Sequence, residues 1–148
     1  EGRQIGILID DGSDATAIAA LRKAAEGAGA TVKIVAPKVG GAKLGDGRKL
    51  PADGQLAGTP SVLFDAVAVV LSDSAGKALA KEAAAVDWVR DAYGHLKAIA
   101  FDAGAHALLQ AGKVAKDAGV VDAADIKAFI DAAKTRQWAR EPKIRTLA

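Results

Sequence analysis

The chain has 148 residues, of which 51% are hydrophobic and 26% are charged, so it can bury one sizeable core and has the composition of a folded globular domain. Its 20 basic and 18 acidic residues are mixed along the sequence and leave a net charge of +2, which argues against nucleic-acid and membrane-surface partners. The absence of cysteine excludes disulfides, thiolate metal sites and a cysteine nucleophile, and no apolar run is long enough to cross a membrane.

The first part of the chain has the pattern of a βαβ unit. Residues 4–9 form an apolar, β-branched run that is typical of a strand buried on both faces. Ser13 or Asp14 can cap the helix that follows, and two closely spaced glycines end it. A second strand at 31–36 stops at Pro37. We therefore expect the two strands to be parallel, with a right-handed crossover.

The next segment interrupts this pattern with a small β-hairpin. Residues 42–44 and 48–50 flank a Gly-Asp-Gly sequence that is typical of a tight turn. Residues 66–71 then predict another strand that is buried on both faces. A helical segment, either continuous or broken, is expected from 72 to about 95.

The last third of the chain continues the alternation of strands and helices. A strand is expected at 97–101, followed by helices at about 105–111 and 123–134 and an irregular tail. This order predicts an α/β domain with an open, mostly parallel sheet and helices on both of its faces. Neither a repeat nor a linker divides the sequence, so residues 1–148 are expected to form a single domain.

Aspartates follow several of the predicted strands. In an open α/β sheet the ligand crevice lies beyond the carboxyl ends of the strands, where Asp10, Asp11, Asp73 and Asp102 are expected. The interpretation that we favour is that Asp10, Asp73 and Asp102 cap or flank helix N-termini. The alternative is a Mg²⁺ site formed by Asp10, Asp11 and Asp73, similar to the acidic pocket of response-regulator receiver domains. The inserted hairpin, and the lack of a lysine followed by proline after the last strand, argue against that alternative.

The bend after the strand at 97–101 is where a nucleophile elbow would lie. Asp102 and Ala103 stand there, and neither side chain is a useful nucleophile for acyl transfer. His106 lies one turn into the next helix without a nucleophile before it, so we interpret it as a surface or boundary histidine. His95 is expected near a helix C-terminus, where a partly cationic imidazole is favourable.

No cofactor site is predicted in this chain. The glycine-rich turns lack the spacing of a dinucleotide-binding or phosphate-binding loop and precede no helix. Trp88 and Trp138 have no interleaved aromatic or basic neighbours, so we interpret both as packing anchors rather than stacking platforms.

The predicted fold and residues 102–112 are similar to the class I glutamine amidotransferase-like superfamily, which includes intracellular-protease-like and stress-response chaperone proteins. In that superfamily a Cys-His-Gly triplet occupies the elbow, and a glutamate in the first helix supports the cysteine. Alignment through the shared glycine places Asp102 at the cysteine and Ala103 at the histidine, and alignment through Asp11-Gly12 places Ala17 at the glutamate. The resemblance implies a flavodoxin-like three-layer sandwich with a small β-hairpin insertion, in which all three catalytic positions are vacated.

Within this superfamily the sequence most resembles the C-terminal domain of large-subunit haem catalases. The segments that carry the resemblance occur in order along the whole chain: Gly2-Arg3, Asp46-Gly47, Leu50-Pro51, Ala57-Gly58, Pro60-Ser61, Asp65-Ala66-Val67, Ala92-Tyr93, His95-Leu96-Lys97, Ile99-Ala100, Trp138, Arg140 and Pro142-Lys143-Ile144. The absence of methionine, even at position 1, agrees with a domain excised from the C-terminus of a longer chain. The resemblance implies a homotetrameric parent that dismutates hydrogen peroxide on a haem, which a tyrosinate holds in an upstream core.

For the domain itself the resemblance implies no catalysis, no metal and no cofactor, because haem is expected in the absent core. We expect an accessory domain that contacts the catalase core and neighbouring subunits, stabilises or assembles the tetramer, and is cytoplasmic. A holdase activity toward unfolded clients is a further expectation, since related superfamily members act in this way. Two alternatives remain open: a Mg²⁺-binding, receiver-like switch at Asp10, Asp11 and Asp73, and a residual hydrolase with an unforeseen nucleophile.

Overall fold

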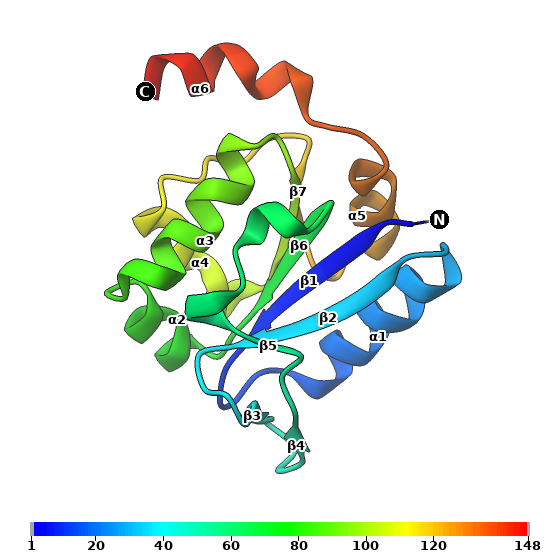
Figure 1. Ribbon diagram of the computed structural model, residues 1–148, viewed down its shortest axis with the longest axis vertical. Helices are drawn as coiled ribbons and strands as arrows, with labels where there is room; N and C mark the ends of the chain where they lie inside the picture. Colours follow the sequence, from blue (N-terminus) through cyan, green and yellow to red (C-terminus); the bar gives the residue numbers. More distant parts are fainter. Residues whose placement is uncertain (1, 148) are drawn as a thin grey trace.

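The computed structural model describes residues 2–147 and contains a central sheet of six parallel strands. The strands are β1 (Gln4–Ile9), β2 (Thr31–Ala36), β5 (Gly54–Gln55), β6 (Ala66–Val70), β7 (Ala98–Phe101) and β8 (Val120–Asp122). They are arranged in the order β5-β2-β1-β6-β7-β8 (Figure 1). The chain therefore reverses its direction of growth between β1 and β6, and in such sheets the ligand crevice lies beyond that point.

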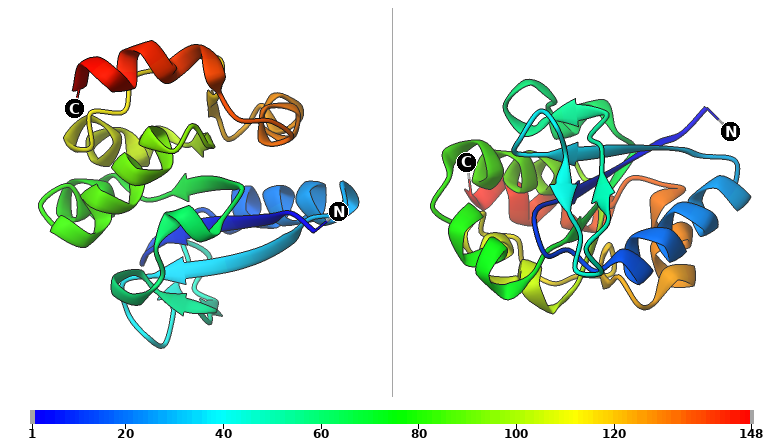
Figure 2. Two further views of the ribbon diagram at one scale, coloured as in Figure 1. Left: turned by 45° about the horizontal axis from the view of Figure 1, so that its top comes forward. Right: turned by 90° about the horizontal axis from the view of Figure 1, so that it is seen from below.

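Helices cover both faces of the sheet, as the sequence predicts. They are α1 (Ala15–Gly27), α2 (Asp73–Leu79), α3 (Ala83–Gly94), α4 (His106–Ala111), α5 (Ile126–Ala133) and α6 (Glu141–Leu147). Figures 1 and 2 show α2, α3 and α4 on one face and α1 and α5 on the other. The flavodoxin-like three-layer arrangement is confirmed. Of the two possibilities for the helical segment at 72–95, the structure has the broken one, with α2 and α3 as its two parts.

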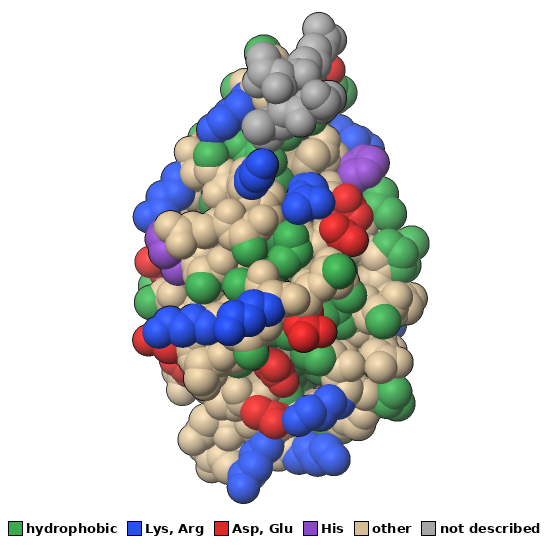
Figure 3. Space-filling view, turned by 90° about the vertical axis from the view of Figure 1, so that its left-hand side faces the viewer, with side chains coloured by type: hydrophobic (Ala, Val, Ile, Leu, Met, Phe, Trp, Pro, Cys, Tyr) green, Lys and Arg blue, Asp and Glu red, His purple; other side chains and the backbone are tan. Residues whose placement is uncertain are grey.

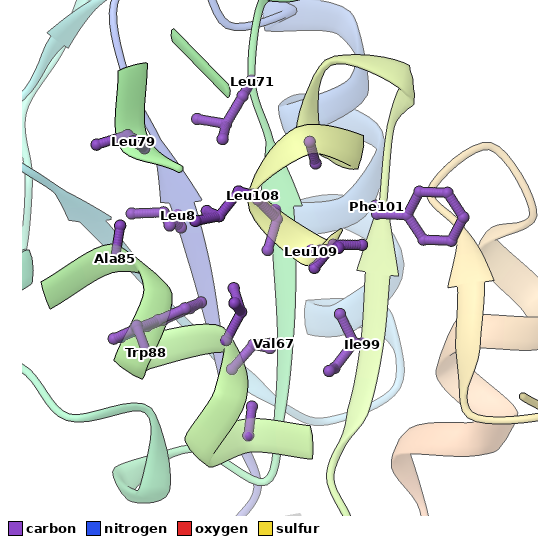
Figure 4. Packing of buried hydrophobic residues seen from close by; sticks show 14 of the residues in the cluster. Leu8, Val67, Leu71, Leu79, Ala85, Trp88, Ile99, Phe101, Leu108 and Leu109 are labelled. Carbon is purple, nitrogen blue, oxygen red and sulfur yellow. The ribbon is translucent and has the colours of Figure 1, made fainter. Parts of the chain in front are cut away.

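Alternating side chains of the strands build a separate core on each face. Leu8, Val67 and Ile99 point toward α2, α3 and α4, where they pack with Trp88 and Leu108 (Figure 4). The intervening strand residues, many of them isoleucine or alanine, pack against α1 and α5 on the other face. Successive strand residues face opposite sides of a sheet, so continuously apolar strands are buried on both faces.

The predicted hairpin is present beside the start of α1. It consists of β3 (Ala42–Lys43) and β4 (Lys49–Leu50), which pair antiparallel. Backbone hydrogen bonds from Gly12 N to Lys43 O (2.8 Å) and from Gly45 N to Ser13 O (2.8 Å) attach it to the loop that precedes α1. The turn of the hairpin consequently lies near the start of α1 (Figure 2, right).

The prediction of an irregular tail is wrong. A short 3₁₀ helix at Trp138–Arg140 leads into α6, which crosses the end of the domain where β7 begins (Figure 1). The expectation that Trp138 is a packing anchor is also wrong, because 62% of its surface is exposed. Arg140 is the anchor instead and is only 3% exposed. Trp88 is buried as predicted, and its indole N–H donates to Thr59 O at 2.9 Å.

The surface that α2, α3 and α4 form carries charges of both signs. In Figure 3, basic and acidic side chains lie next to one another on this face, and hydrophobic side chains are scattered among them. Within residues 2–147, none of the helices combines the length and the apolar character that a membrane crossing needs.

Candidate functional site

The carboxyl ends of β1 and β6 are joined through Ser13. This serine is fully buried, its hydroxyl accepts from Asp10 N at 3.0 Å, and it donates to Val70 O. The Asp10 carboxylate accepts from Asp11 N at 2.8 Å, so it stabilises the turn and not the helix. Asp14 caps α1 by accepting from the backbone N–H groups of its first turn. Of the two residues that the sequence offers as caps, Asp14 therefore has this role.

Asp11 is bound on both carboxylate oxygens. Lys38 donates to one oxygen at 2.7 Å, and Lys43 N donates to the other at 3.0 Å. The hydrogen bond from Lys38 is the main reason that the pKa of Asp11 lies below its usual value. Both partners are exposed, so the pair contributes little to stability. Asp11 consequently fastens the hairpin to the end of β1.

At the neighbouring strand, Ser72 is the N-cap of α2 and accepts from Ala75 N at 3.2 Å. Asp73 is the first residue of that helix and is exposed. Its position suits the helix dipole, as expected for a carboxylate that flanks a helix N-terminus. In residues 2–144, whose side chains are described, no three His, Cys, Asp or Glu side chains come together as a metal site. The structure thus does not group Asp10, Asp11 and Asp73 for metal binding.

Asp102 lies at the bend after β7 and has ordinary extended backbone geometry, with φ −105° and ψ 177°. Its carboxylate accepts from Leu71 N at 3.1 Å and so connects the ends of β6 and β7. Burial raises the pKa of Asp102. The hydrogen bond from Leu71 N acts to lower this pKa, and the nearby Asp14 carboxylate acts to raise it further. A nucleophile elbow has a sharp, strained turn that exposes its nucleophile, and this bend lacks that geometry.

The backbone at Gly104 is packed too closely for a side chain. A Cβ placed on Gly104 would overlap Leu71 O, and a Cβ placed on Gly76 of α2 would overlap Gly104 O. The short 3₁₀ helix at Ala103–Ala105 therefore packs with its backbone directly against α2 and the end of β6. Backbone atoms of α2 and of the end of β6 therefore occupy the space next to Gly104.

The other residues considered as catalytic candidates are dispersed. Ala17 lies in the first turn of α1, where its N–H donates to Asp14, and its side chain packs at the edge of the core. Ala103 is exposed. His106 begins α4 and is exposed, and His95 is exposed and follows the last residue of α3, as predicted. Neither histidine has a nucleophile bonded to it among the described residues.

A buried arginine, Arg140, lies at the opposite end of the sheet. The sequence did not predict that it forms an ion pair. Arg140 donates through Nε and one terminal nitrogen to the two oxygens of Asp117, at 2.7 and 3.1 Å. Its other terminal nitrogen donates to Tyr93 O at 3.0 Å and Lys97 O at 2.9 Å. Arg140 was noted in the sequence only as part of a motif, and no pattern of spacing identified Asp117 as its partner.

Tyr93 does not fit the role of a haem ligand. The guanidinium of Arg140 lies over its ring, 4.3 Å from the centroid, and the residue is only 2% exposed. Its hydroxyl is buried and has no hydrogen-bond partner. A haem iron could reach this oxygen only if the side chains that bury it moved aside. Tyr93 is the only tyrosine of the chain, so these residues do not form a tyrosinate haem site.

Comparisons with known proteins agree on one family. The family model described as the C-terminal domain found in long catalases matches residues 1–138. The chain is 40% identical over 151 residues to "Catalase C" of Rhizobium meliloti, covering 98% of this chain and 21% of that protein. It is 34% identical over 119 residues to "Catalase HPII" of Pseudomonas aeruginosa, covering 80% of this chain and 17% of that protein. The chain thus spans about a fifth of the length of these relatives.

Solved structures support the fold. The oxidized DJ-1 of Toxoplasma gondii superposes with a TM-score of 0.71 at 13% identity, covering 99% of this chain and 97% of that one. DJ-1beta of Drosophila melanogaster superposes with a TM-score of 0.71 at 14% identity, covering 97% and 96%. At these identities the likeness shows the fold alone. It confirms the α/β three-layer fold that the sequence predicts.

Proposed function

Since this chain belongs to the family of C-terminal domains found in long catalases, we propose that it is a non-catalytic accessory domain that stabilises or assembles a parent haem catalase. In this proposal the parent dismutates hydrogen peroxide on a haem in its upstream core. The domain contacts that core and neighbouring subunits of a cytoplasmic homotetramer. It supplies no catalytic group, cofactor site or metal ligand of its own.

The proposal rests on which residues form the bend after β7 and on how closely they are packed. The positions that the superfamily uses for catalysis hold Asp102, Ala103 and Ala17, which provide neither a thiol nor an imidazole. Asp102 is engaged with Leu71 N, and the glycine contacts between α2 and the bend fill the surrounding space with backbone. A nucleophile needs a base within hydrogen-bonding reach, and the described residues at this bend contain no such pair.

A contact surface for the core is favoured at the amino-terminal edge of the sheet. Val62 and Leu63 lie just before β6 and are 45% and 61% exposed, although large aliphatic side chains are usually buried. Trp138 lies beside the start of β7, because Gln137 N donates to Leu96 O at 2.8 Å. Exposed aromatic side chains on rigid backbone are the typical anchors of protein interfaces.

The same edge is where a preceding chain would join the domain. Thr31 N donates to Arg3 O at 2.9 Å, which places Arg3 at the start of the paired strands β1 and β2. An upstream catalase core would therefore reach the domain on the side that carries Leu63 and Trp138. In this proposal the exposed apolar side chains lie on the edge at which the preceding chain would join the domain.

The proposal predicts that removing this apolar surface weakens the parent assembly. The test uses a full-length catalase that carries this chain as its C-terminal domain. The double substitution Leu63→Ser with Trp138→Ser should shorten the half-life of its tetramer on heating, while the initial peroxide turnover per haem stays unchanged. Val39→Ser is the matched control, because Val39 is 74% exposed at the carboxyl edge of the sheet. Equal half-lives for the double variant and the control would argue against this docking surface.

The isolated chain provides a second test. We expect no turnover of hydrogen peroxide, acyl esters or glycated substrates, since no nucleophile–base pair is described at the bend. Turnover that persists in a purified sample and is lost in Asp102→Ala would reveal a residual hydrolase.

The holdase part of the proposal predicts that the chain suppresses aggregation of an unfolded client at stoichiometric amounts. Undiminished aggregation would remove that part and leave the assembly role intact.

A further inference from the structure

A groove lies between α1 and the hairpin, on residues of both elements. Its volume is about 540 Å³, which is within the range of small-molecule sites. The residues that line it are Ala15, Ile18, Ala19, Arg22, Lys23, Glu26, Leu44, Arg48, Lys49 and Leu50. Neither the family match nor the bend after β7 accounts for this groove.

The floor of the groove is apolar and fixed. Ile18 and Leu44 are buried in the core that α1 and the hairpin share, and Leu50 packs partly buried against it. The hairpin cannot move freely relative to α1, because two backbone hydrogen bonds connect it to the loop that precedes the helix. A ligand would therefore meet a surface that is largely formed before it binds, which lowers the entropic cost of binding.

The rim of the groove concentrates positive charge. Four of its ten lining residues are cationic and one is anionic, a net charge of +3, whereas the whole chain carries only +2. Arg48 is engaged by Asp46 at 2.6 Å, but Asp46 is outside the lining. Within the described residues, Arg22, Lys23 and Lys49 make no ion pair. Their charges remain available to an anion, and an apolar wall beside them strengthens that attraction.

We propose that this groove binds a small amphipathic anion, an aliphatic chain that ends in a carboxylate. The aliphatic part would lie on Ile18, Leu44 and Leu50, and the carboxylate would be held by the unpaired cations of the rim. Charge complementarity favours an anion, and the apolar floor favours a ligand with a hydrophobic body over a simple inorganic ion. The site is independent of the accessory role proposed for the domain.

The test is titration of the 148-residue chain with decanoate below its micelle-forming concentration, followed by NMR of the backbone amides. The expected result is saturable shifts confined to α1 and the hairpin. Decyltrimethylammonium, which has the same chain length and the opposite charge, should not bind there. Shifts distributed over the whole surface, or equal binding of the two probes, would overturn the proposal.

Ala19→Glu is the decisive variant. Ala19 is an exposed helix position that lines the groove, so a glutamate fits the helix but occupies the groove and repels a carboxylate. Decanoate affinity should fall about tenfold or more, equivalent to about 1.4 kcal/mol. Ala78→Glu adds the same side chain at an exposed position of α2 and should leave the affinity unchanged.

Two further results would contradict the proposal. One is unchanged decanoate affinity in a correctly folded Ala19→Glu variant. The other is a concentration-dependent dimer in sedimentation that Ala19→Glu dissociates, because the groove would then be occupied by a second copy of the chain.

A double variant, Arg22→Gln with Lys49→Gln, removes charge without filling space and should also weaken decanoate binding.

Discussion

Asp102 and Asp117 are both partly buried carboxylates, but their surroundings shift the two pKa values in opposite directions. At Asp102 burial is the largest influence and raises the pKa. At Asp117 burial acts in the same direction, but hydrogen bonds from Arg140 and Gly119 N outweigh it and lower the pKa. Asp117 is thus compensated by a cation, whereas the ionised form of Asp102 carries a desolvation cost.

Asp102→Asn should therefore raise the free energy of unfolding at neutral pH. The folded-state pKa of Asp102 lies above the reference value of 3.8, so its ionised form destabilises the folded state. The amide oxygen of asparagine can still accept from Leu71 N. The advantage should shrink as the pH falls through the folded-state pKa and vanish below 3.8, where the aspartate is protonated in both states. Urea unfolding as a function of pH measures this difference, and a destabilised variant at pH 7 would show that the charge itself is needed.

Arg140→Met should cost the domain about 3 kcal/mol of unfolding free energy, because removing one member of a buried pair leaves the other uncompensated. Asp117 would lose both of its contacts with Arg140, and two backbone carbonyl groups would lose their donor. The lowered pKa of Asp117 means that this contribution is present at neutral pH and is lost on acidification through that pKa. Arg90→Met is the matched control, since Arg90 pairs with Asp87 on the surface, and should change stability by about 0.5 kcal/mol or less.

At the scale of single elements, the strands that sequence reasoning found are those with continuous apolar runs. Strands β1, β6 and β7 are mainly such runs, and β2 was found through the apolar residues at its end and the proline that stops it; the structure confirms all four within a residue at each end. Strands β5 and β8 were missed because they have two and three residues, too few for a periodic pattern. Helix α6 was missed because the buried pair that anchors it joins residues 23 positions apart, and only the fold brings these together.

Gly104→Ala tests whether the bend after β7 is filled by backbone packing. The added Cβ would overlap Leu71 O, so the expected cost is about 1–3 kcal/mol of unfolding free energy. The control is Gly94→Ala at the end of α3, where nothing lies near the added Cβ, and it should be neutral or slightly stabilising. If thermal melts showed that both variants are equally stable, the bend would have space for a side chain at Gly104, which would contradict the close packing described here.

At the candidate site, the sequence identified the residue types but not their contacts. The vacated positions Ala17, Asp102 and Ala103 could be named through the resemblance, because a glycine and an Asp-Gly pair align the segments. That Asp102 bridges to Leu71, and that Asp11 holds Lys38, depends on contacts between segments 27 to 31 positions apart. Such pairings follow from the order of the strands, which spacing in the sequence does not encode.

Considered as a whole, the molecule has two edges of different character. The carboxyl edge of the sheet carries the hairpin, the aspartates and the closely packed bend. The amino edge carries the start of β1, the exposed Leu63 and Trp138, and the tail that Arg140 fastens. A domain that docks through its amino edge would leave the carboxyl edge and the cationic groove accessible. This division is consistent with an accessory domain that acts through contacts.

The most direct test of that account compares a full-length catalase of this family with the same enzyme truncated before the segment that matches residues 1–148. The measurement is the half-life of peroxide-dismutating activity at elevated temperature, with activity expressed per haem. We predict that truncation leaves the initial activity per haem unchanged and shortens the half-life. An enzyme that loses its activity per haem at the outset, but whose remaining activity decays at the original rate, would contradict the account.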